Sequence, residues 1–213
     1  AEMIPMKDPV LSFGNSGSDA NDTHIKLLRY YHEAIGKPEC RKIISRERSY
    51  HGVTVAAASL TGLPVTQNHF DLPVDALGIL RTDHPHYYRG KQGDESEAEF
   101  VDRIVGNLEA MIVREGPDTI AAFIAEPITG ASGVIVPPAD YYQKVKAVLN
   151  RYNIMFWADE VITGFGRTGS DFGCNTMGIE SPDMMTFAKQ LSSAYMPISA
   201  SAVRREMYDA MIE

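Results

Sequence analysis

The sequence predicts an α/β fold, a three-layer α/β/α sandwich with a mostly parallel central sheet. Short runs that are apolar throughout alternate along the chain with longer segments of helical periodicity. A strand that is apolar throughout is typical of a parallel sheet whose two faces are both covered by helices. The 17 glycines and 12 prolines are scattered singly, and no linker or repeat divides the 213 residues. We therefore expect one continuous domain over residues 1–213.

Four segments are predicted as helices from the spacing and size of their apolar residues. They are residues 19–35, 53–60, 96–114 and 139–152. In the first segment Ile25, Leu28, Tyr31 and Ile35 share one face, and Gly36 ends the pattern.

Five short segments are predicted as strands: the first is rich in β-forming residues, and the other four are largely apolar and too short for free helices. They are residues 41–45, 119–125, 154–158, 184–188 and 198–203. At the ends of residues 119–125, 154–158 and 184–188 stand the ionisable residues Glu126, Asp159 with Glu160, and Lys189. Each one alone is equally typical of a solvated sheet rim. Because ligands bind at the carboxyl ends of parallel strands, the four together favour a polar functional site.

The charge balance and the cysteines limit the function classes. Twenty basic against 28 acidic residues give a net charge of −8, which disfavours nucleic acid as a partner. No apolar run is long enough to span a membrane and no signal peptide is recognisable, so we expect a soluble protein without a membrane partner. Cys40 and Cys174 are far apart in the sequence, which gives no support to a disulfide framework or a zinc site. We therefore expect a reducing, cytoplasmic location.

Residues 15–21, Asn-Ser-Gly-Ser-Asp-Ala-Asn, lead into the first predicted helix. We expect Ser18 or Asp19 to cap this helix, so that its free N–H groups and the preceding Gly17 form a cradle for an anion such as phosphate. Plain helix capping is the alternative, and it is commoner for an isolated motif of this kind.

Two other patterns resemble known sites, but their context disfavours both. Residues 164–169, Gly-Phe-Gly-Arg-Thr-Gly, match the glycine pattern of nicotinamide dinucleotide binding. Five residues separate them from the preceding strand, however, and no helical pattern follows. His84 and His86 flank Pro85 in a loop without a third ligand at a recognisable spacing. We therefore expect neither a dinucleotide site nor a metal site.

Five separated motifs together resemble those of the class III aminotransferases, pyridoxal-phosphate (PLP) enzymes of fold type I, the aspartate-aminotransferase fold. In chain order they are residues 15–22, Tyr50-His51-Gly52, Ala125-Glu126-Pro127, Asp159-Glu160-Val161 with 164–169, and Ala188-Lys189. The motifs follow the order of the family and extend over most of the chain. The resemblance implies a PLP-binding large domain, with pyridoxal 5'-phosphate as its cofactor.

The resemblance assigns catalytic roles to two residues. Lys189 is similar to the lysine that holds PLP as an imine and then moves a proton. An amine reacts only when it is unprotonated, so we expect the site to bury this side chain. Asp159 is similar to the carboxylate that pairs with the pyridine nitrogen and favours the protonated, electron-accepting ring.

The same resemblance assigns eight further residues to the cofactor site. Tyr50 and Val161 are expected to pack on the two faces of the ring. Gly17 and Ser18 are expected to form the phosphate cradle, and Glu126 to lie beside the cofactor without an assigned role. The remaining members of the set are Ser16, His51 and Gly52.

The activity that the resemblance implies is amino-group transfer from an amine or ω-amino acid to a keto acid such as pyruvate. Residues 131–138 resemble the ω-amino-acid:pyruvate branch more than the aminomutase branch. An aminomutase or decarboxylase with the same lysine and aspartate is one alternative, and a noncatalytic domain that retains the fold is another. The family also implies a homodimer, or a dimer of dimers, with a shared active site.

The chain departs from the family in three ways. Residues 190–194, Gln-Leu-Ser-Ser-Ala, follow the lysine where relatives are richer in glycine, and Asp19 stands where a glutamate is usual. The chain is also about half as long as such subunits. We therefore expect the large domain of a longer subunit, with an N-terminal segment, a C-terminal small domain and the arginine for the substrate carboxylate lying outside it.

Overall fold

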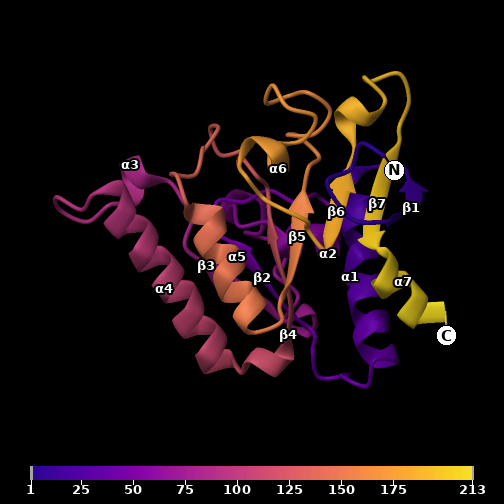
Figure 1. Ribbon diagram of the computed structural model, residues 1–213, viewed down its shortest axis with the longest axis horizontal. Coiled ribbons are helices and arrows are strands. Elements are labelled where there is room, and N and C mark those ends of the chain that lie inside the picture. The colour runs from indigo at the N-terminus through magenta and orange to yellow at the C-terminus, as the bar shows by residue number, and fades with distance from the viewer. Residues whose placement is uncertain (1, 213) are drawn as a thin grey trace.

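The computed structural model describes residues 2–212 and contains one seven-stranded sheet with the order β1-β7-β6-β5-β4-β2-β3 (Figure 1). The strands are β1 (Pro9–Gly14), β2 (Lys42–Arg46), β3 (Ile79–Thr82), β4 (Ile120–Ala125), β5 (Met155–Asp159), β6 (Met184–Phe187) and β7 (Ser199–Arg204). Strands β3, β2, β4, β5 and β6 pair in parallel, whereas β7 runs antiparallel to both β6 and β1. The predicted α/β fold with a mostly parallel sheet is confirmed.

Helices cover both faces of this sheet, which makes the predicted three-layer sandwich. The helices are α1 (Gly17–Ala34), α2 (Val55–Leu60), α3 (Tyr87–Gly90), α4 (Glu97–Glu115), α5 (Tyr141–Arg151), α6 (Gly173–Thr176) and α7 (Arg205–Ile212). Helices α4 and α5 pack on one face, and α1 and α7 pack on the other (Figure 1). Successive residues of β5 alternate between the layers: Phe156 and Ala158 join the first core, and Trp157 joins the second.

The first helix begins earlier than predicted, because its cap is Ser16 and neither Ser18 nor Asp19. The Ser16 backbone is extended, and its Oγ accepts a hydrogen bond from Asp19 N at 3.1 Å. Asp19 Oδ2 in turn accepts from Asn15 N at 2.9 Å. Asp19 thus bonds to the residue before the cap, and a capping box, in which the side chain at this position accepts from the N–H of the cap residue itself, is not formed. Gly17 and Ser18 therefore belong to the first turn of α1.

The sequence did not predict β1 and β3, the two strands at the edges of the sheet. β1 is partly exposed along its whole length, and three of the four residues of β3 are partly exposed. An edge strand that is not buried on both faces has no need of the continuous apolar run that marks β4 and β5. The reversed direction of β7 likewise has no counterpart in the apolar pattern of residues 198–203.

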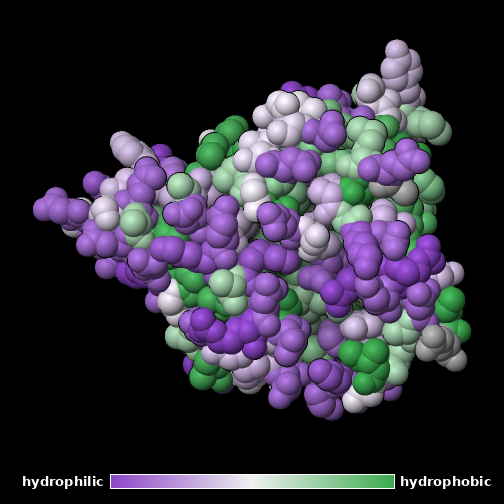
Figure 2. Space-filling view, viewed as in Figure 1, coloured by the Kyte–Doolittle hydropathy of each residue, from purple (hydrophilic) through white to green (hydrophobic). Residues whose placement is uncertain are grey.

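Figure 2 shows hydrophilic side chains over much of α4 and α5, whose apolar sides face the sheet. Ser96 and Glu99 form a complete capping box at the start of α4, which satisfies two backbone N–H groups of that end. Within residues 2–212, none of the helices combines the length and the apolar character needed to cross a membrane.

Candidate active site

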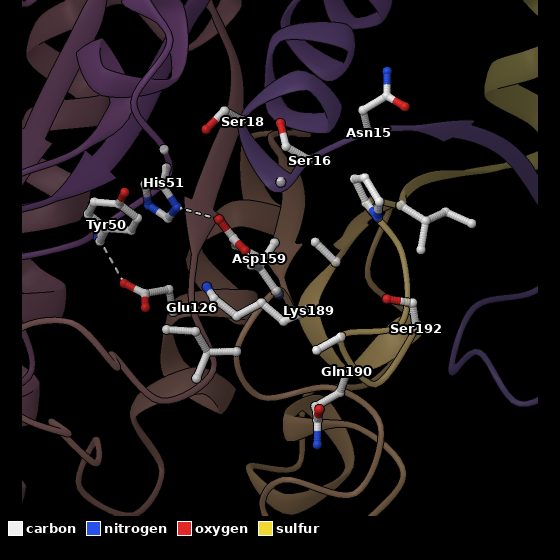
Figure 3. A pocket seen from close by; sticks show the side chains of 18 of the residues that line it. Asn15, Ser16, Ser18, Tyr50, His51, Glu126, Asp159, Lys189, Gln190 and Ser192 are labelled. Atoms are coloured by element: carbon white, nitrogen blue, oxygen red, sulfur yellow. Dashed lines mark hydrogen bonds and ion pairs between the residues drawn. The ribbon is translucent and has the colours of Figure 1, made fainter.

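A cavity of about 420 Å³ opens at the carboxyl ends of β4, β5 and β6, and the start of α1 forms part of its wall (Figure 3). All ten residues assigned to the site from the sequence line it. They are Ser16, Gly17, Ser18, Tyr50, His51, Gly52, Glu126, Asp159, Val161 and Lys189. The sheet thus brings together groups that lie up to 173 positions apart in the chain. Their roles toward a cofactor stay predictions.

The start of α1 is packed tightly against the segment that follows β5. A Cβ atom on Gly17 would lie 2.9 Å from Cγ2 of Val161, which is closer than side chains approach one another. Ser18 turns its Oγ toward the neighbouring loop and accepts a hydrogen bond from Val53 N at 3.0 Å. Gly52 has a φ of +136°, and a Cβ there would meet Ser18 Oγ at 2.5 Å. Glycine is therefore required at both positions for the backbones to approach.

Asp159 is the last residue of β5 and is only 3% exposed. Its Oδ2 accepts hydrogen bonds from His51 Nδ1 at 2.8 Å and from Asn21 Nδ2 at 3.1 Å. Its Oδ1 accepts from Val161 N at 3.1 Å. A carboxylate offers about four acceptor positions, so one position on Oδ1 remains for a donor in the cavity.

Glu126 follows β4 directly and is 2% exposed. Its two carboxylate oxygens accept hydrogen bonds from Tyr50 N at 2.9 Å and from Gly130 N at 3.0 Å. Burial raises the pKa of this carboxyl above its ordinary value, and the neighbouring His51 offsets part of that effect. Glu126 is therefore a fixed group at the cavity wall that holds a proton more readily than an exposed glutamate does.

Arg46 supports this wall, and the sequence analysis missed it. It ends β2, is fully buried, and donates to Glu126 O at 2.7 Å, Thr129 Oγ1 at 3.1 Å and Tyr142 Oη at 3.0 Å. These bonds fix the backbone that carries Glu126. Arg46 directly follows the predicted strand 41–45, so its position at a strand end, the signal that identified Glu126, Asp159 and Lys189, could also have found it.

Lys189 lies in a short 3-10 turn, Lys189–Leu191, just after β6, and its side chain is exposed to the open cavity. The expectation of a buried lysine is therefore wrong for this structure: β6 ends at Phe187, so the lysine stands beyond the buried part of the sheet. Its φ of 45° lies in the left-handed region that residues other than glycine rarely adopt. Figure 3 shows the side chain reaching across the cavity below Asp159 toward Glu126.

The segment after Lys189 forms the opposite wall. Gln190, Ser192 and Ala194 line the cavity, as do residues 196–198. Ser193 and Ala194 have φ values of 51° and 67°, again in the left-handed region. The structure therefore adopts the backbone conformation that glycine favours, although this chain carries no glycine there.

Glu160, the fourth ionisable residue at a strand end, points away from the cavity. Its carboxylate accepts hydrogen bonds from Gly173 N at 3.0 Å and from Cys174 N at 2.7 Å, and also from Thr163 Oγ1. It thereby anchors both ends of the loop that contains residues 164–169. That loop consists of turns and does not open a helix, so the strand, turn and helix of a dinucleotide site are not formed.

The rings of His84 and His86 lie 5.9 Å apart between their centroids. Across the described residues 2–212, no group of three or more His, Cys, Asp or Glu side chains is placed to hold a metal ion.

The residues present fit pyridoxal phosphate. The backbone N–H groups at the start of α1 suit a phosphate, because a helix N-terminus carries partial positive charge. Asp159 retains an acceptor position for a protonated ring nitrogen, and Lys189 supplies an amine to the same cavity. The glycines at positions 17 and 52 keep the cradle free of side chains.

Comparisons with known proteins agree with this arrangement. The family model of the class III aminotransferases matches residues 1–212. The chain is 54% identical over 199 residues to "Gamma aminobutyrate transaminase 3, chloroplastic" of Solanum lycopersicum, a match that covers 93% of the chain and 38% of that protein. It is equally identical, with the same coverage, to "Probable gamma-aminobutyrate transaminase 3, mitochondrial" of Oryza sativa subsp. japonica.

Solved structures give the same result. A transaminase with L-ala superimposes with a TM-score of 0.96 at 53% identity, covering 99% of this chain and 48% of that one. The omega transaminase from Pseudomonas jessenii in complex with PMP superimposes with a TM-score of 0.96 at 51% identity, covering 99% and 46%. The chain thus spans about two fifths of these curated relatives and about half of these solved chains. It belongs to the class III aminotransferases, a family that uses pyridoxal phosphate.

Proposed function

We propose that this protein catalyses PLP-dependent transamination, moving an amino group from an amine or ω-amino acid to a keto acid such as pyruvate. The observation that carries the proposal is the meeting of Lys189, Asp159 and the start of α1 at one cavity in a class III chain. These three supply an amine, a carboxylate and an anion cradle, which are the groups that PLP chemistry needs from a protein.

Each part of the cavity has a defined task toward the cofactor. Gly17 and Ser18 would offer backbone N–H groups to the phosphate, and Tyr50 and Val161 would pack on the two faces of the ring. The Asp159 carboxylate is held by three hydrogen bonds, so it needs little reorganisation to keep a ring nitrogen protonated. When bound, PLP supplies the electron sink that stabilises a carbanion next to the substrate nitrogen.

The proton transfers are assigned to Lys189. Its Nζ would hold the cofactor covalently, and when free it would accept and return a proton as a general base and acid. Its exposure to the open cavity leaves room for the substrate to approach. Glu126, with its raised pKa, is placed to orient a substrate or cofactor group by a hydrogen bond.

The names of the relatives support a substrate class. Curated relatives are named as gamma-aminobutyrate transaminases, and one structural neighbour carries L-ala in its title. We propose an ω-amino acid as donor, with pyruvate as the acceptor that becomes alanine. We further propose a homodimer that completes the site. The cytoplasmic location stays a prediction, and the names of the plant relatives place those proteins in mitochondria or chloroplasts.

The decisive experiment is a spectral titration of the full-length protein reconstituted with PLP. Adding gamma-aminobutyrate alone should convert the cofactor band to that of the amino form, and adding pyruvate should restore it with formation of alanine. Product formed without any keto acid would indicate an aminomutase or decarboxylase instead. A protein that binds no PLP would be a noncatalytic domain.

A further inference from the structure

Behind Asp159 lies a buried polar cluster that the proposed function does not use. It consists of Asn21 and His24 on α1, Trp157 on β5 and Thr186 on β6, and all four are 0% exposed. Because these polar groups are buried in the core between α1 and the sheet, they bond to one another and to the neighbouring His51 and Asp159. The direction of each hydrogen bond follows from which atoms can donate and which can only accept.

The amide of Asn21 has a defined orientation. Its Nδ2 lies 2.6 Å from His51 O and 3.1 Å from Asp159 Oδ2, and both of those atoms only accept. The Nδ2 must therefore donate to them, which turns Oδ1 toward Thr186. Thr186 Oγ1 lies 2.7 Å from this Oδ1, so the hydroxyl uses its single proton to donate to Asn21.

The remaining contacts of Thr186 follow from this assignment. Trp157 Nε1 lies 2.8 Å from Thr186 Oγ1 and can only donate. His24 Nδ1 lies 3.0 Å from the same oxygen, which has no proton left to give. His24 must then donate from Nδ1. Its Nε2 lies toward the backbone of Ala202 but makes no hydrogen bond of good geometry among the described residues, so in the neutral ring it carries the lone pair. Burial lowers the pKa of His24 to about 3, so the ring is neutral.

We propose that these residues form a directed hydrogen-bond relay, in which Trp157 and His24 donate to Thr186, Thr186 donates to Asn21, and Asn21 donates to Asp159. This inference rests on the proposed function, because it makes Thr186 and Asn21 positioning residues for the cofactor-facing carboxylate. Hydrogen bonds in a chain polarise one another, so each donor strengthens the bond that Asp159 receives on Oδ2. The relay thereby holds the carboxylate with Oδ1 available to the cavity.

The first test determines which ring nitrogen of His24 carries the proton, and it needs no enzymatic reaction. In the protein labelled with ¹⁵N-histidine, with His24→Gln used to assign the signal, NMR at pH 7 should show a neutral His24 ring protonated on Nδ1. Thr186→Val removes the acceptor, and the Nδ1–H form should then give way to a mixture of tautomers. A wild-type His24 protonated on Nε2 alone would overturn the relay.

The second test measures the affinity for PLP by equilibrium dialysis. Thr186→Val should raise the Kd about tenfold, which is roughly the effect of one hydrogen bond to a charged group, and Thr186→Ser should return it to within about twofold. Ser201→Ala is the matched control: Ser201 pairs with Thr186 in the sheet and bonds to Ala20 O of the same helix, but lies outside the relay. Its Kd should equal that of the wild type.

Trp157→Phe keeps a buried aromatic ring and removes one donor, so it serves if Thr186→Val does not fold. We expect it to raise the Kd about threefold. A Kd that is unchanged in both Thr186→Val and Trp157→Phe, or one that Thr186→Ser does not restore, would overturn the inference. A wild-type protein that binds no PLP would contradict the proposed function instead, and the His24 tautomer alone would then decide the relay.

Discussion

Val161 leaves no room for a side chain at Gly17: a Cβ on Gly17 would lie 2.9 Å from Val161 Cγ2. The first turn of α1 and the segment after β5 thus approach as closely as backbone and side chain allow. One of these residues belongs to the proposed phosphate cradle and the other to the proposed ring contact. A change at position 17 is therefore expected to disturb both.

Gly17→Ala should weaken PLP binding by about tenfold or more, because the added methyl group displaces Val161 and shifts the start of the helix. The melting temperature should change little, since alanine favours a helix more than glycine does. Gly106→Ala in α4 is the control, because a Cβ there meets nothing within 4 Å. It should stabilise the fold by about 0.5–1 kcal/mol and leave the PLP affinity unchanged. Equal PLP affinity in both variants would place the phosphate elsewhere.

Asp159→Asn should keep the cofactor bound but lower kcat by roughly 100- to 1,000-fold, the range found when one preorganised electrostatic group is removed. An amide is neutral and cannot hold a ring nitrogen in its protonated form as a carboxylate does. The measurement is steady-state kinetics together with the absorption spectrum of the bound cofactor. Near wild-type turnover would contradict the role given to Asp159.

The strand-end rule explains how much of the site could be predicted. Glu126, Asp159 and Lys189 each follow an apolar run, and the parallel sheet brings the three ends to one cavity. Glu160 satisfies the same rule but is turned away, because successive residues of an extended chain point to opposite sides. The rule cannot say which of two adjacent carboxylates faces the cavity.

For a different reason, the sequence could not predict the groups that support Asp159, namely Asn21 and Thr186. Asn21 and Thr186 are 165 positions apart, and neither stands at the end of a strand. Their partnership depends on how α1 lies across the sheet, which no local pattern encodes. The edge strands were missed because partial exposure removes the apolar run on which the prediction relied.

Ala194→Gly should stabilise the protein, because Ala194 has a φ of 67°, which disfavours any residue with a Cβ. We expect a gain of about 0.5–1 kcal/mol after the greater chain entropy of glycine is subtracted. Thermal unfolding measures it. Ala139→Gly is the control at an exposed turn residue that lacks a positive φ, and it should lose stability slightly. A loss of thermal stability in both Ala194→Gly and Ala139→Gly would show that the backbone of residue 194 is not strained.

His32 should make the fold sensitive to acid. Burial lowers its pKa from 6.5 to about 4, and the nearby Lys37 adds to this effect. Between these values the unfolded chain binds a proton that the folded protein does not, so the free energy of unfolding falls as the pH drops from about 6.5 toward 4. Urea unfolding at pH 7 and pH 5 should show a smaller fall for His32→Gln. The exposed His69, changed to asparagine, should leave the fall as it is in the wild type.

The covalent attachment of the cofactor should depend on Lys189 and on no other lysine. Lys189 reaches the cavity that Asp159 lines, whereas Lys144 on α5 pairs with Asp102 at the surface. Borohydride reduction of the reconstituted full-length protein should therefore fix the cofactor to the peptide containing Lys189. Lys189→Ala should lose both the label and amino transfer while keeping the melting temperature near that of the wild type, because the exposed Nζ makes no contact on which the core depends. Lys144→Ala should keep both the label on the Lys189 peptide and the amino transfer. A label on another peptide, or substantial transfer by Lys189→Ala, would show that the central step of the proposed mechanism is wrong.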